Sequence, residues 1–412
     1  MKIDIAVIGG GPAGLAAALK AREEGMNVLI LERERELGGV LPQCIHTGFG
    51  NIIFKEMLTG PEYANRFIKK VKEAGIMTKT DTTVLEINDK RIIATSVGNV
   101  FEIYPKAIIL AMGCRERTRA QILIPGDRPA GIYTAGTAQR LINMEGVMPG
   151  KEIVILGSGD IGLIMARRFF LEGATVKGVY EILPYPSGLM RNIVQCLEDY
   201  NIPLYLSHTV TAIKGRKRLE GVMVAKVDAE MKPIKNTERF VPCDTLILAV
   251  GLIPENELSR KAGIEIDERT GGPIVDERME TSVNGIFACG NVVHVHDLVD
   301  DVTEISYIAG KNAAKFVKNG LKKRKPIKIV AGKNVSYAVP QIIRGEWEDD
   351  VTIYLRVRKE QHNAKLVLSI KKDIIFEKKE KIVRPSEMVK IKIPKDEGKK
   401  IEGDEIKIDV EG

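Results

Sequence analysis

Two segments of this chain repeat one pattern, and that repeat restricts the folds open to the chain. Residues 3–32 read IDIAVIGGGPAGLAAALKAREEGMNVLILE, and residues 152–181 read EIVILGSGDIGLIMARRFFLEGATVKGVYE. Each copy has an apolar run, the spacing G-x-G-x-x-G, a stretch with small residues on one helical face, and a second apolar run that ends in Glu. This order is typical of a strand, a turn, a helix and a strand, so the sequence predicts an α/β protein with two units of one kind.

The glycines and the final acid of each copy indicate a dinucleotide. Gly9 and Gly11 allow the backbone to turn tightly and approach a pyrophosphate, and Gly14 allows the helix to pack close to the sheet. The pyrophosphate then lies at the amino end of the helix, where free N–H groups attract anions. Glu32 ends the second strand, where a carboxylate can accept ribose hydroxyls. The second copy repeats the set with Gly157, Gly159, Gly162 and Glu181.

Further apolar runs complete the two units. AIILAMG at 107–113 follows the first copy, LILAVG at 246–251 follows the second, and GIFACGN at 285–291 precedes a helical pattern from about 302 to 319. Such runs are typical of buried parallel strands, and their order predicts that the second unit is inserted into the first. The predicted domains are 1–115 with 246–322 for the first unit, 116–245 for the second, and 323–412 for a C-terminal domain.

The C-terminal segment has a different pattern. DVTIYLRVRKE alternates the apolar residues Val351, Ile353, Leu355 and Val357 with polar neighbours, and AKLVLSIKK, MVKIKIP and DEIKIDV repeat the alternation. This period predicts a small β-rich domain. Its functional interpretation is docking of a partner subunit or self-association into a homo-oligomer, and the alternative is a stabilising cover.

The net charge of the chain is concentrated at its end. Residues 321–412 carry 23 Lys and Arg against 16 Asp and Glu, and so account for the whole net charge of +7. Both signs are mixed there, and no aromatic-plus-basic recognition module accompanies them. We therefore expect a solvated surface or an acidic protein partner, and no nucleic acid.

Several other classes of protein find no support in the sequence. No apolar run approaches the roughly 18 residues of a membrane span, and MKIDIAVIGG enters a strand without a signal-peptide pattern. The cysteines are few and dispersed, which favours a reducing compartment, and we expect the cytoplasm. They and the histidines lack the spacing of zinc ligands, so no metal is expected. No P-loop or G-x-S-x-G elbow supports kinase or hydrolase chemistry.

Together the motifs resemble those of the pyridine nucleotide–disulfide oxidoreductase superfamily, the flavoproteins with two dinucleotide-binding domains that include glutathione and thioredoxin reductases. The resemblance covers about residues 1–320 and rests on GGGPAG with Glu32, AMG, GSGDIG with Glu181, AVGLIPE and TSVNGIFACGN. It implies a glutathione-reductase-like α/β fold with two Rossmann-like domains, FAD in the first and NAD(H), or less favourably NADP(H), in the second.

The resemblance also implies which residues contact the cofactors. For FAD they are Gly9, Gly11, Pro12, Ala13, Gly14, Glu32, Arg33, Gly38, Gly39, Val40, Cys44, Val84, Ala111, Met112, Gly113, Gly290, Asn291, Val302 and Thr303. For the nicotinamide dinucleotide they are Gly157, Gly159, Asp160, Ile161, Gly162, Glu181 and Gly251.

Three local features modify what the resemblance implies. Asn291 stands where the family has an Asp that holds the ribityl chain, so it can hydrogen-bond but carries no charge. VVHVHDLVDD lengthens the join to the last helix, whose start at Val302 and Thr303 would face the pyrimidine edge of the flavin and stabilise negative charge there. Glu181 repels a 2′-phosphate and the following ILPYP offers no Arg, so NADH is favoured over NADPH.

The segment GGVLPQCIH, residues 38–46, carries Cys44 without a second cysteine. The redox pair of the family stands three and eight positions after the first glycine, and those positions are Leu41 and His46 here. A local redox disulfide is therefore excluded, and residues 116–245 also lack the C-x-x-C of thioredoxin reductases. Three interpretations stay open. Cys44 packs against the flavin while His46 caps a loop; Cys44 is a thiolate that tunes the flavin or forms an adduct; or His46 exchanges the proton that accompanies hydride transfer.

The remaining histidines and cysteines near the motifs are expected to be structural. His294 and His296 would point to the same side of an extended segment, where packing is favoured and a place at the flavin is the alternative. Cys114 and Cys289 are expected to pack beside the cofactor-binding strands.

A finer resemblance concerns GGVLPQCIHTGFG, FKEMLTGPEYA, GIYTAGTAQRLIN and VVHVHDLVD. These segments look like the flavoprotein that accompanies anaerobic glycerol-3-phosphate dehydrogenase, and YTAGTAQ is also similar to the large subunits of hydrogen cyanide synthase, opine oxidase and sarcosine oxidase. The leading prediction is an FAD-dependent oxidoreductase that exchanges hydride with NADH and passes electrons to or from a partner subunit or small acceptor. The alternatives are a subunit that oxidises an amine or hydroxy acid, and a non-catalytic assembly or redox-sensing subunit.

Overall fold

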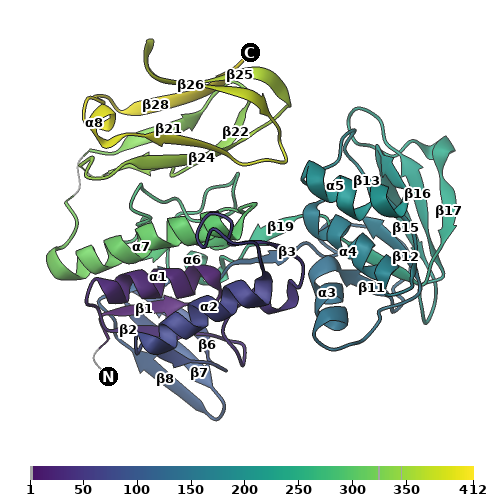
Figure 1. Ribbon diagram of the computed structural model, residues 1–412, viewed down its shortest axis with the longest axis horizontal. Helices are drawn as coiled ribbons and strands as arrows, with labels where there is room; N and C mark the ends of the chain where they lie inside the picture. Colours follow the sequence, from purple (N-terminus) through teal and green to yellow (C-terminus); the bar gives the residue numbers. More distant parts are fainter. Residues whose placement is uncertain (1–2, 323–324, 345) are drawn as a thin grey trace. The chain divides into compact units, whose positions relative to one another are not determined.

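The computed structural model describes residues 3–322, 325–344 and 346–412, and the chain divides into two compact units (Figure 1). Unit 1 comprises Met1–Cys114 and Pro254–Gly412, and unit 2 comprises Arg115–Ile253. Unit 1 is thus built from two stretches of chain that flank unit 2 in the sequence. The chain passes from one unit to the other through the paired strands β10 (Cys114–Glu116) and β19 (Leu252–Pro254). The bounds proposed above for three domains stay predictions.

A parallel sheet forms the centre of the first part of unit 1. Its strand order is β20-β9-β1-β2-β5, and every adjacent pair is parallel. The strands are β1 (Ile5–Ile8), β2 (Val28–Leu31), β5 (Met77–Lys79), β9 (Ala107–Leu110) and β20 (Ile286–Ala288). Every residue of β1, β2 and β9 is buried, as expected for a parallel sheet covered on both faces.

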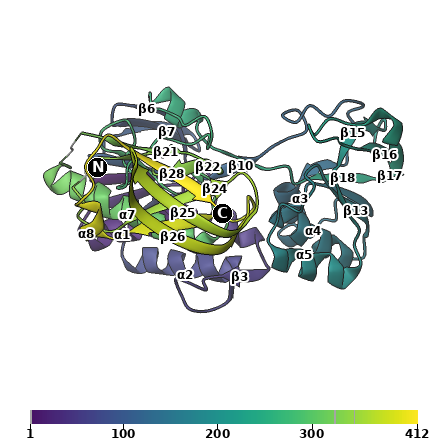
Figure 2. The same ribbon diagram turned by 90° about the horizontal axis from the view of Figure 1, so that it is seen from above.

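Three helices pack on this part of unit 1. They are α1 (Pro12–Glu23), α2 (Gly60–Glu73) and α7 (Val299–Asn319). Helices α1 and α7 lie side by side (Figures 1 and 2), and a Cβ at Gly310 would lie 2.3 Å from the carbonyl oxygen of Ala17, so glycine is required for their close approach. Helix α7 begins three residues before the predicted start, because Asp300 and Asp301 are helical and favour the positive end of the helix dipole.

Shorter elements complete the region around the first fingerprint. The antiparallel strands are β6 (Thr83–Asn88), β7 (Arg91–Ser96) and β8 (Asn99–Ile103), with a separate pair formed by β3 (Thr47–Phe49) and β4 (Leu58–Thr59). The short helices are η1 (Leu41–Gln43), α6 (Glu257–Lys261) and η4 (Gly290–Val292).

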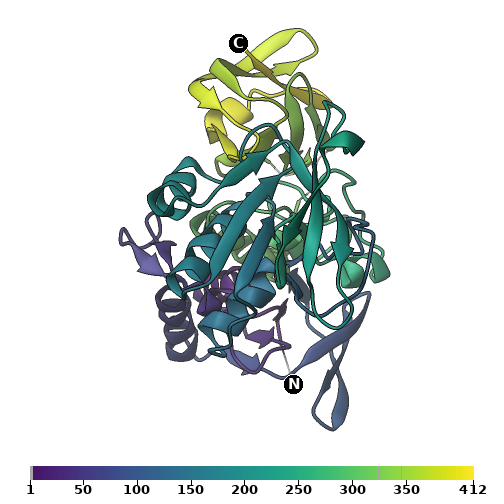
Figure 3. The same cartoon turned by 90° about the vertical axis from the view of Figure 1, so that its right-hand side faces the viewer.

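Unit 2 repeats the parallel arrangement and is seen best in Figure 3. Its strand order is β11-β18-β12-β13-β14, again with parallel pairs throughout. The strands are β11 (Ile132–Thr134), β12 (Glu152–Leu156), β13 (Thr175–Glu181), β14 (Leu204–Leu206) and β18 (Thr245–Leu248). The helices are α3 (Ala135–Asn143), α4 (Asp160–Leu171) and α5 (Met190–Cys196), followed in sequence by η2 (Glu198–Tyr200). An antiparallel sheet is formed by β15 (His208–Lys214), β16 (Gly221–Lys226) and β17 (Arg239–Pro242), and η3 (Lys235–Thr237) precedes β17.

The C-terminal part of unit 1 is built from two sheets with their own hydrophobic core, drawn from light green to yellow in Figure 1. One sheet has the order β23-β21-β28-β25-β26, with bounds β21 (Ile327–Ala331), β23 (Ile342–Ile343), β25 (Gln361–Ile370), β26 (Asp373–Val383) and β28 (Glu405–Glu411). The other has the order β22-β24-β27, with bounds β22 (Val335–Val339), β24 (Val351–Val357) and β27 (Val389–Ile393), and α8 (Lys395–Gly398) follows it. The four apolar residues predicted to alternate along β24 are all buried.

Helices long and apolar enough to cross a bilayer do not occur in the described parts of the chain.

Candidate cofactor sites

The first glycine fingerprint forms the tight turn between β1 and α1. Gly9 has a φ of +106°, and a Cβ there would lie 2.4 Å from the carbonyl oxygen of Ala111, at the end of the neighbouring strand β9. A Cβ at Gly14 would lie 1.8 Å from the carbonyl oxygen of Gly9. Both positions therefore require glycine, as the sequence predicts, and the turn brings β1, β9 and α1 into contact.

The amino end of α1 is shaped for an anion. A Cβ at Gly11 would meet only one described atom within reach, the Cα of Gly39 at 3.6 Å, so the backbone is open in front of the helix. No described side chain caps this helix end, and its first turn carries no acid. The N–H groups of the first turn are thus available to a pyrophosphate. These features fit FAD at the first fingerprint.

Glu32 lies at the end of β2, beside this turn. Its Oε2 accepts a hydrogen bond from the Gly10 amide at 2.6 Å, and its Oε1 accepts one from the Glu34 amide at 2.8 Å. Each oxygen keeps a second lone pair for a ribose hydroxyl. The Thr82 amide donates to the Glu32 carbonyl oxygen at 2.9 Å, which brings the start of β6, with Val84, to the same end of the sheet.

Residues far apart in the sequence meet where the flavin end of FAD is expected. A Cβ at Gly290 would lie 2.7 Å from the Cβ of Ala13 and 3.2 Å from Cγ1 of Val302. The side chain of Asn291 accepts a hydrogen bond from the His296 amide at 3.0 Å, and its amide nitrogen lies 3.7 Å from Sγ of Cys114. The structure therefore brings α1, η4 and the start of α7 together.

Some predicted FAD contacts have other partners in the structure. The Thr303 hydroxyl is hydrogen-bonded to the Tyr63 hydroxyl at 2.8 Å, which ties α7 to α2. The Arg33 side chain is exposed and lies 3.9 Å from the Glu34 carboxylate. Val40 is exposed, and Met112 packs against the hydrophobic core. The contacts of all these residues with FAD stay predictions.

Cys44 lies just after η1 and is buried. Its Sγ donates to the Val40 carbonyl oxygen at 3.4 Å, and burial raises the pKa of the thiol to about 12. A Cβ at Gly60 would lie 2.7 Å from Cβ of Cys44, so the amino end of α2 packs directly on this residue. His46 is partly exposed, and its ring lies 5.0 Å from that of Phe49. The surroundings of Cys44 thus favour the packing interpretation over the thiolate one.

The second fingerprint repeats the local geometry in unit 2. Gly157 has a φ of +99°, and a Cβ there would lie 2.2 Å from the carbonyl oxygen of Ala249, just after β18. A Cβ at Gly162 would lie 2.6 Å from the Gly157 carbonyl oxygen. At Gly159 the nearest described atom would be 3.9 Å away, and no described side chain caps α4. This turn also fits a dinucleotide, with Gly251 in the segment that follows β18.

Glu181 is the centre of a hydrogen-bond network at the end of β13. Its Oε2 accepts hydrogen bonds from the Ser158 amide at 2.9 Å, the Ser158 hydroxyl at 2.6 Å and the Ser187 hydroxyl at 2.9 Å. Its Oε1 accepts one from the Leu183 amide at 3.0 Å. Oε1 is thus the oxygen with capacity for a ribose hydroxyl. The Asp160 side chain accepts instead from the Leu189 amide at 2.8 Å and holds the start of α5.

Sequence reasoning did not identify Ser187, which comes from the loop after β13. The residue type and spacing give no signal, because only the return of this loop to the fingerprint places its hydroxyl on Glu181.

His294 and His296 form a buried pair in the segment between η4 and α7. Their ring centroids lie 4.1 Å apart, and the ring of Tyr354 on β24 lies 5.7 Å from His294 and 5.4 Å from His296. Within the described residues, none of the four ring nitrogens has a hydrogen-bond partner. Burial lowers the pKa of His294 and lowers that of His296 to about 3, so both rings are neutral.

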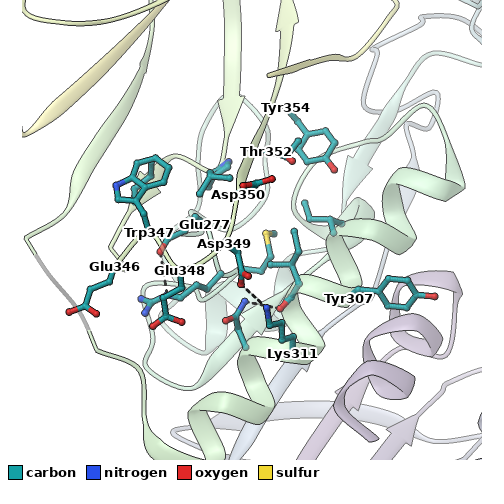
Figure 4. A pocket seen from close by; sticks show the side chains of 18 of the residues that line it. Glu277, Tyr307, Lys311, Glu346, Trp347, Glu348, Asp349, Asp350, Thr352 and Tyr354 are labelled. Carbon is teal, nitrogen blue, oxygen red and sulfur yellow. Dashed lines mark hydrogen bonds and ion pairs between the residues drawn. The ribbon is translucent and has the colours of Figure 1, made fainter. Parts of the chain in front are cut away.

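A cavity of about 220 Å³ lies elsewhere in unit 1, between α7 and the residues that precede β24 (Figure 4). The Lys311 side chain on α7 contacts the Asp349 carboxylate at 2.6 Å, and Glu346, Glu348 and Asp350 lie around them. None of the residues that line this cavity belongs to either fingerprint.

Two glycine turns, each with an open helix end and a buried Glu, define a protein that binds two dinucleotides. The family of pyridine nucleotide-disulphide oxidoreductases matches residues 3–320, so the chain belongs to this family. Members of the family are FAD- and NAD(P)H-dependent oxidoreductases, which confirms the predicted class of enzyme and its cofactors at the level of the family.

Individual relatives differ in the chemistry that their names state. An opine oxidase subunit of Agrobacterium tumefaciens is 26% identical over 70% of this chain and 61% of its own length. Hydrogen cyanide synthase subunit HcnB of Pseudomonas protegens is 26% identical over 64% and 60%. NADH oxidase of Methanocaldococcus jannaschii is 29% identical over 75% and 69%. The chain therefore spans about three fifths of the length of the first two relatives.

Solved structures support the fold. The thioredoxin reductase of Lactococcus lactis matches 77% of this chain and 99% of its own, with a TM-score of 0.63 at 23% identity. An NAD-dependent persulfide reductase from A. fulgidus matches 89% of this chain and 67% of its own, with a TM-score of 0.60 at 22% identity. The prediction of a mixed α/β fold with parallel, Rossmann-like units is thus confirmed.

Proposed function

We propose that this chain is an FAD-dependent oxidoreductase that exchanges hydride between NADH and FAD and passes electrons to or from a partner without a redox disulfide. The observation that carries this proposal is the pair of open glycine turns with their buried carboxylates, Glu32 and Glu181, in a chain of this family. The two bound cofactors supply the hydride chemistry. The chain contributes their binding and orientation, and it excludes water from the reacting edges.

The route of the electrons beyond FAD is inferred from the position and the pKa of Cys44. A disulfide relay needs two neighbouring thiols, whereas the two positions of the family's redox pair are Leu41 and His46 here, and Cys44 matches neither. A thiol whose pKa is about 12 is also a poor nucleophile at neutral pH. We infer that electrons pass directly between the flavin and the next carrier.

The preference for NADH is inferred from Glu181. Its buried carboxylate stands at the end of β13, where it accepts the hydroxyls of an unmodified ribose and repels a 2′-phosphate. The surrounding hydrogen bonds hold the carboxylate in place, so it cannot turn away from a phosphate without breaking them.

We propose a partner subunit as the carrier that accepts electrons from the flavin or donates electrons to it. Two of the relatives are themselves named as subunits, one of an opine oxidase and one of a hydrogen cyanide synthase. The sequence segments described above also resemble the flavoprotein that accompanies anaerobic glycerol-3-phosphate dehydrogenase. We therefore propose a place in a multi-component dehydrogenase, with a glycerol-3-phosphate dehydrogenase-type complex as the first case to test.

A second candidate function is oxidation of an amine or hydroxy acid by the flavin of this chain. It is favoured by the similarity to opine oxidase subunits from two organisms, at 26% and 24% identity.

An anaerobic titration with NADH tests these functions. The purified chain with bound flavin is mixed with NADH while the visible absorption of the flavin is followed. Bleaching at one NADH per flavin supports the proposed function. Bleaching by an opine or a hydroxy acid, but not by NADH, supports the second candidate. Bound flavin that none of these donors reduces would contradict both and support a structural or sensing role.

The coenzyme preference has its own test in Glu181→Gln. The substitution keeps the shape of the side chain and removes its charge, so we expect the ratio of kcat/KM for NADH to that for NADPH to fall by at least about tenfold, because opposed like charges cost several kcal/mol and about 1.4 kcal/mol is already tenfold. Glu172→Gln is the matched control, since Glu172 follows α4 in the same unit and pairs with Arg168. An unchanged ratio in Glu181→Gln would contradict the assignment.

A further inference from the structure

Two strands of the C-terminal part of unit 1 hold the segment between η4 and α7. Asp297 in this segment accepts a hydrogen bond from the Met388 amide, just before β27, at 2.6 Å, and its other oxygen pairs with Arg356 on β24. Lys390 on β27 pairs with Asp301 in the first turn of α7 and lies 3.8 Å from Glu304. Strands β24 and β27 therefore place two cations against acids, one in this segment and one at the start of α7.

The amino end of α7 carries two buried carboxylates. Asp300 and Asp301 are both only 2% exposed. Asp300 accepts hydrogen bonds from the Gly50 amide at 3.1 Å and the Ile53 amide at 2.9 Å, so its charge is stabilised by backbone dipoles. Asp301 is paired instead with the ammonium group of Lys390. Without that ammonium group, the buried carboxylate of Asp301 would have no counter-ion and only the dipole of α7 to stabilise it.

This helix end borders the place where the flavin end of FAD is expected. The ribose position is set by Glu32 and the pyrophosphate by the turn at Gly11, so the rest of the cofactor must extend past Ala13 toward Gly290. Val302, next to Asp301, is the α7 residue that a Cβ at Gly290 would touch. The nearby His294 and His296 are neutral because burial lowers the pKa of each. The segment itself therefore supplies no cation, and Lys390 comes from the C-terminal part of the chain.

We propose that Lys390 sets the redox potential of the flavin by offsetting the charge of Asp301 at the amino end of α7. This proposal rests on the proposed function, because it requires FAD in unit 1. Hydride transfer from NADH brings two electrons and one proton to the flavin, so the reduced flavin carries one more negative charge than the oxidised form until a second proton follows. A nearby uncompensated carboxylate disfavours that charge, and a nearby ammonium group favours it.

Three variants test this proposal. The two single variants should shift the flavin equilibrium in opposite directions, and the double variant should restore it. Lys390→Gln leaves Asp301 without its cation, so we expect the equilibrium between oxidised and reduced flavin to shift at least tenfold toward the oxidised form, which is about 30 mV for a two-electron couple. Asp301→Asn leaves Lys390 with its charge, so we expect a shift toward the reduced form. The double variant Lys390→Gln/Asp301→Asn should return to within about threefold of the parent chain. Lys392→Gln is the matched control, because Lys392 lies on the same strand, pairs with the exposed Asp350 at 3.0 Å and should leave the equilibrium unchanged.

The measurement is the flavin midpoint potential, obtained by anaerobic reduction of the full chain together with a dye of known potential. Flavin content is measured for each variant, so that loss of cofactor is not mistaken for a change of potential. Equal potentials in Lys390→Gln and the parent chain would overturn the proposal, and so would an equal shift in Lys392→Gln. If Lys390→Gln does not fold, a potential of Asp301→Asn that is unchanged or lower would overturn it. Failure of the proposed function is seen separately, as a parent chain that binds no flavin or is not reduced by NADH.

Discussion

Cys44 shows how burial alone changes the chemistry of one residue. Its thiol lies between the Val40 carbonyl oxygen and the amino end of α2, and desolvation raises its pKa to about 12. The nucleophilic form of cysteine is the thiolate, and at pH 8 a thiol with this pKa is ionised in about one molecule in ten thousand. The residue is therefore suited to packing and poorly suited to adduct formation.

The rate of alkylation measures directly how far the Cys44 thiol is ionised. We expect iodoacetamide at pH 8 to modify Cys44 in the folded chain about a thousandfold more slowly than in the urea-unfolded chain, where the ordinary pKa is about 8.5. Peptide mass spectrometry follows each cysteine separately, and the partly exposed Cys114 serves as an internal comparison. Rapid modification of Cys44 in the folded chain would instead support the thiolate interpretation.

The residues predicted from sequence are those whose function depends on local spacing. Gly9, Gly11 and Glu32 belong to one strand, turn and strand, so their meeting is encoded within 24 residues. Lys390 and Asp301 are separated by 89 residues and meet only through packing of the C-terminal strands on α7. No pattern within either segment indicates that contact, and the role of Lys390 was therefore not predictable from the sequence.

At the scale of elements, the segment between η4 and α7 depends on one carboxylate. Asp297 receives the Met388 amide and pairs with Arg356, so it joins this segment to both β24 and β27. We expect Asp297→Ala to lower the free energy of unfolding by about 2–4 kcal/mol, because Arg356 would lose its counter-charge in a largely buried place. Urea unfolding followed by the fluorescence of Trp347, the single tryptophan, reports on this part of the chain.

The control for this substitution is Asp349→Ala. Asp349 pairs with Lys311 of the same helix α7, but the side chain of Asp349 is 65% exposed. An exposed ion pair contributes less than about 1 kcal/mol, so we expect only a small loss of stability. Similar losses in the two variants would show that Asp297 does not anchor the segment.

The sequence predicted well those elements that bury one face or that are buried on both faces. The residues of β24 alternate as predicted because one face packs in the core formed with the other sheet. Strand β26 was not predicted, because DIIFEKKEKIV lies at the edge of its sheet and only Val383 of this strand is buried, so its apolar and polar residues do not alternate. The start of α7 was predicted too late, because acids at a helix start look like loop residues in a sequence.

At the scale of the whole molecule, the internal repeat predicted two parallel-sheet units because each copy carries a complete set of local signals. The packing of Tyr354 on His294 and His296 was not predictable, since it joins elements whose own patterns give no reason for the contact. This packing buries two histidines without hydrogen-bond partners for their rings among the described residues, and that has a consequence for stability.

The consequence is a loss of stability in mild acid. In the folded chain, burial holds the pKa of His296 at about 3 and lowers that of His294, while in the unfolded chain both have the ordinary value of about 6.5. Below pH 6.5 the unfolded chain therefore takes up protons that the folded chain does not, and stability falls as the pH falls toward the folded pKa values. From pH 7 to pH 5 the expected loss is about 2 kcal/mol for His296, and His294 adds to this loss in the same direction.

The double variant His294→Phe/His296→Phe isolates the contribution of the two histidines to the pH dependence of stability. Phenylalanine fills a similar volume without ring nitrogens, so the variant should match or exceed the parent chain in stability at pH 7 and should lose at least about 2 kcal/mol less between pH 7 and pH 5. Asp276 and Glu277, whose pKa values burial raises, lose protons on unfolding and act in the opposite direction. They are the same in both proteins, so they cancel in the difference between the two pH profiles. Urea unfolding by Trp347 fluorescence at each pH gives that difference. Parallel profiles would mean that the folded chain protonates the two rings as readily as the unfolded chain does, and would contradict the prediction.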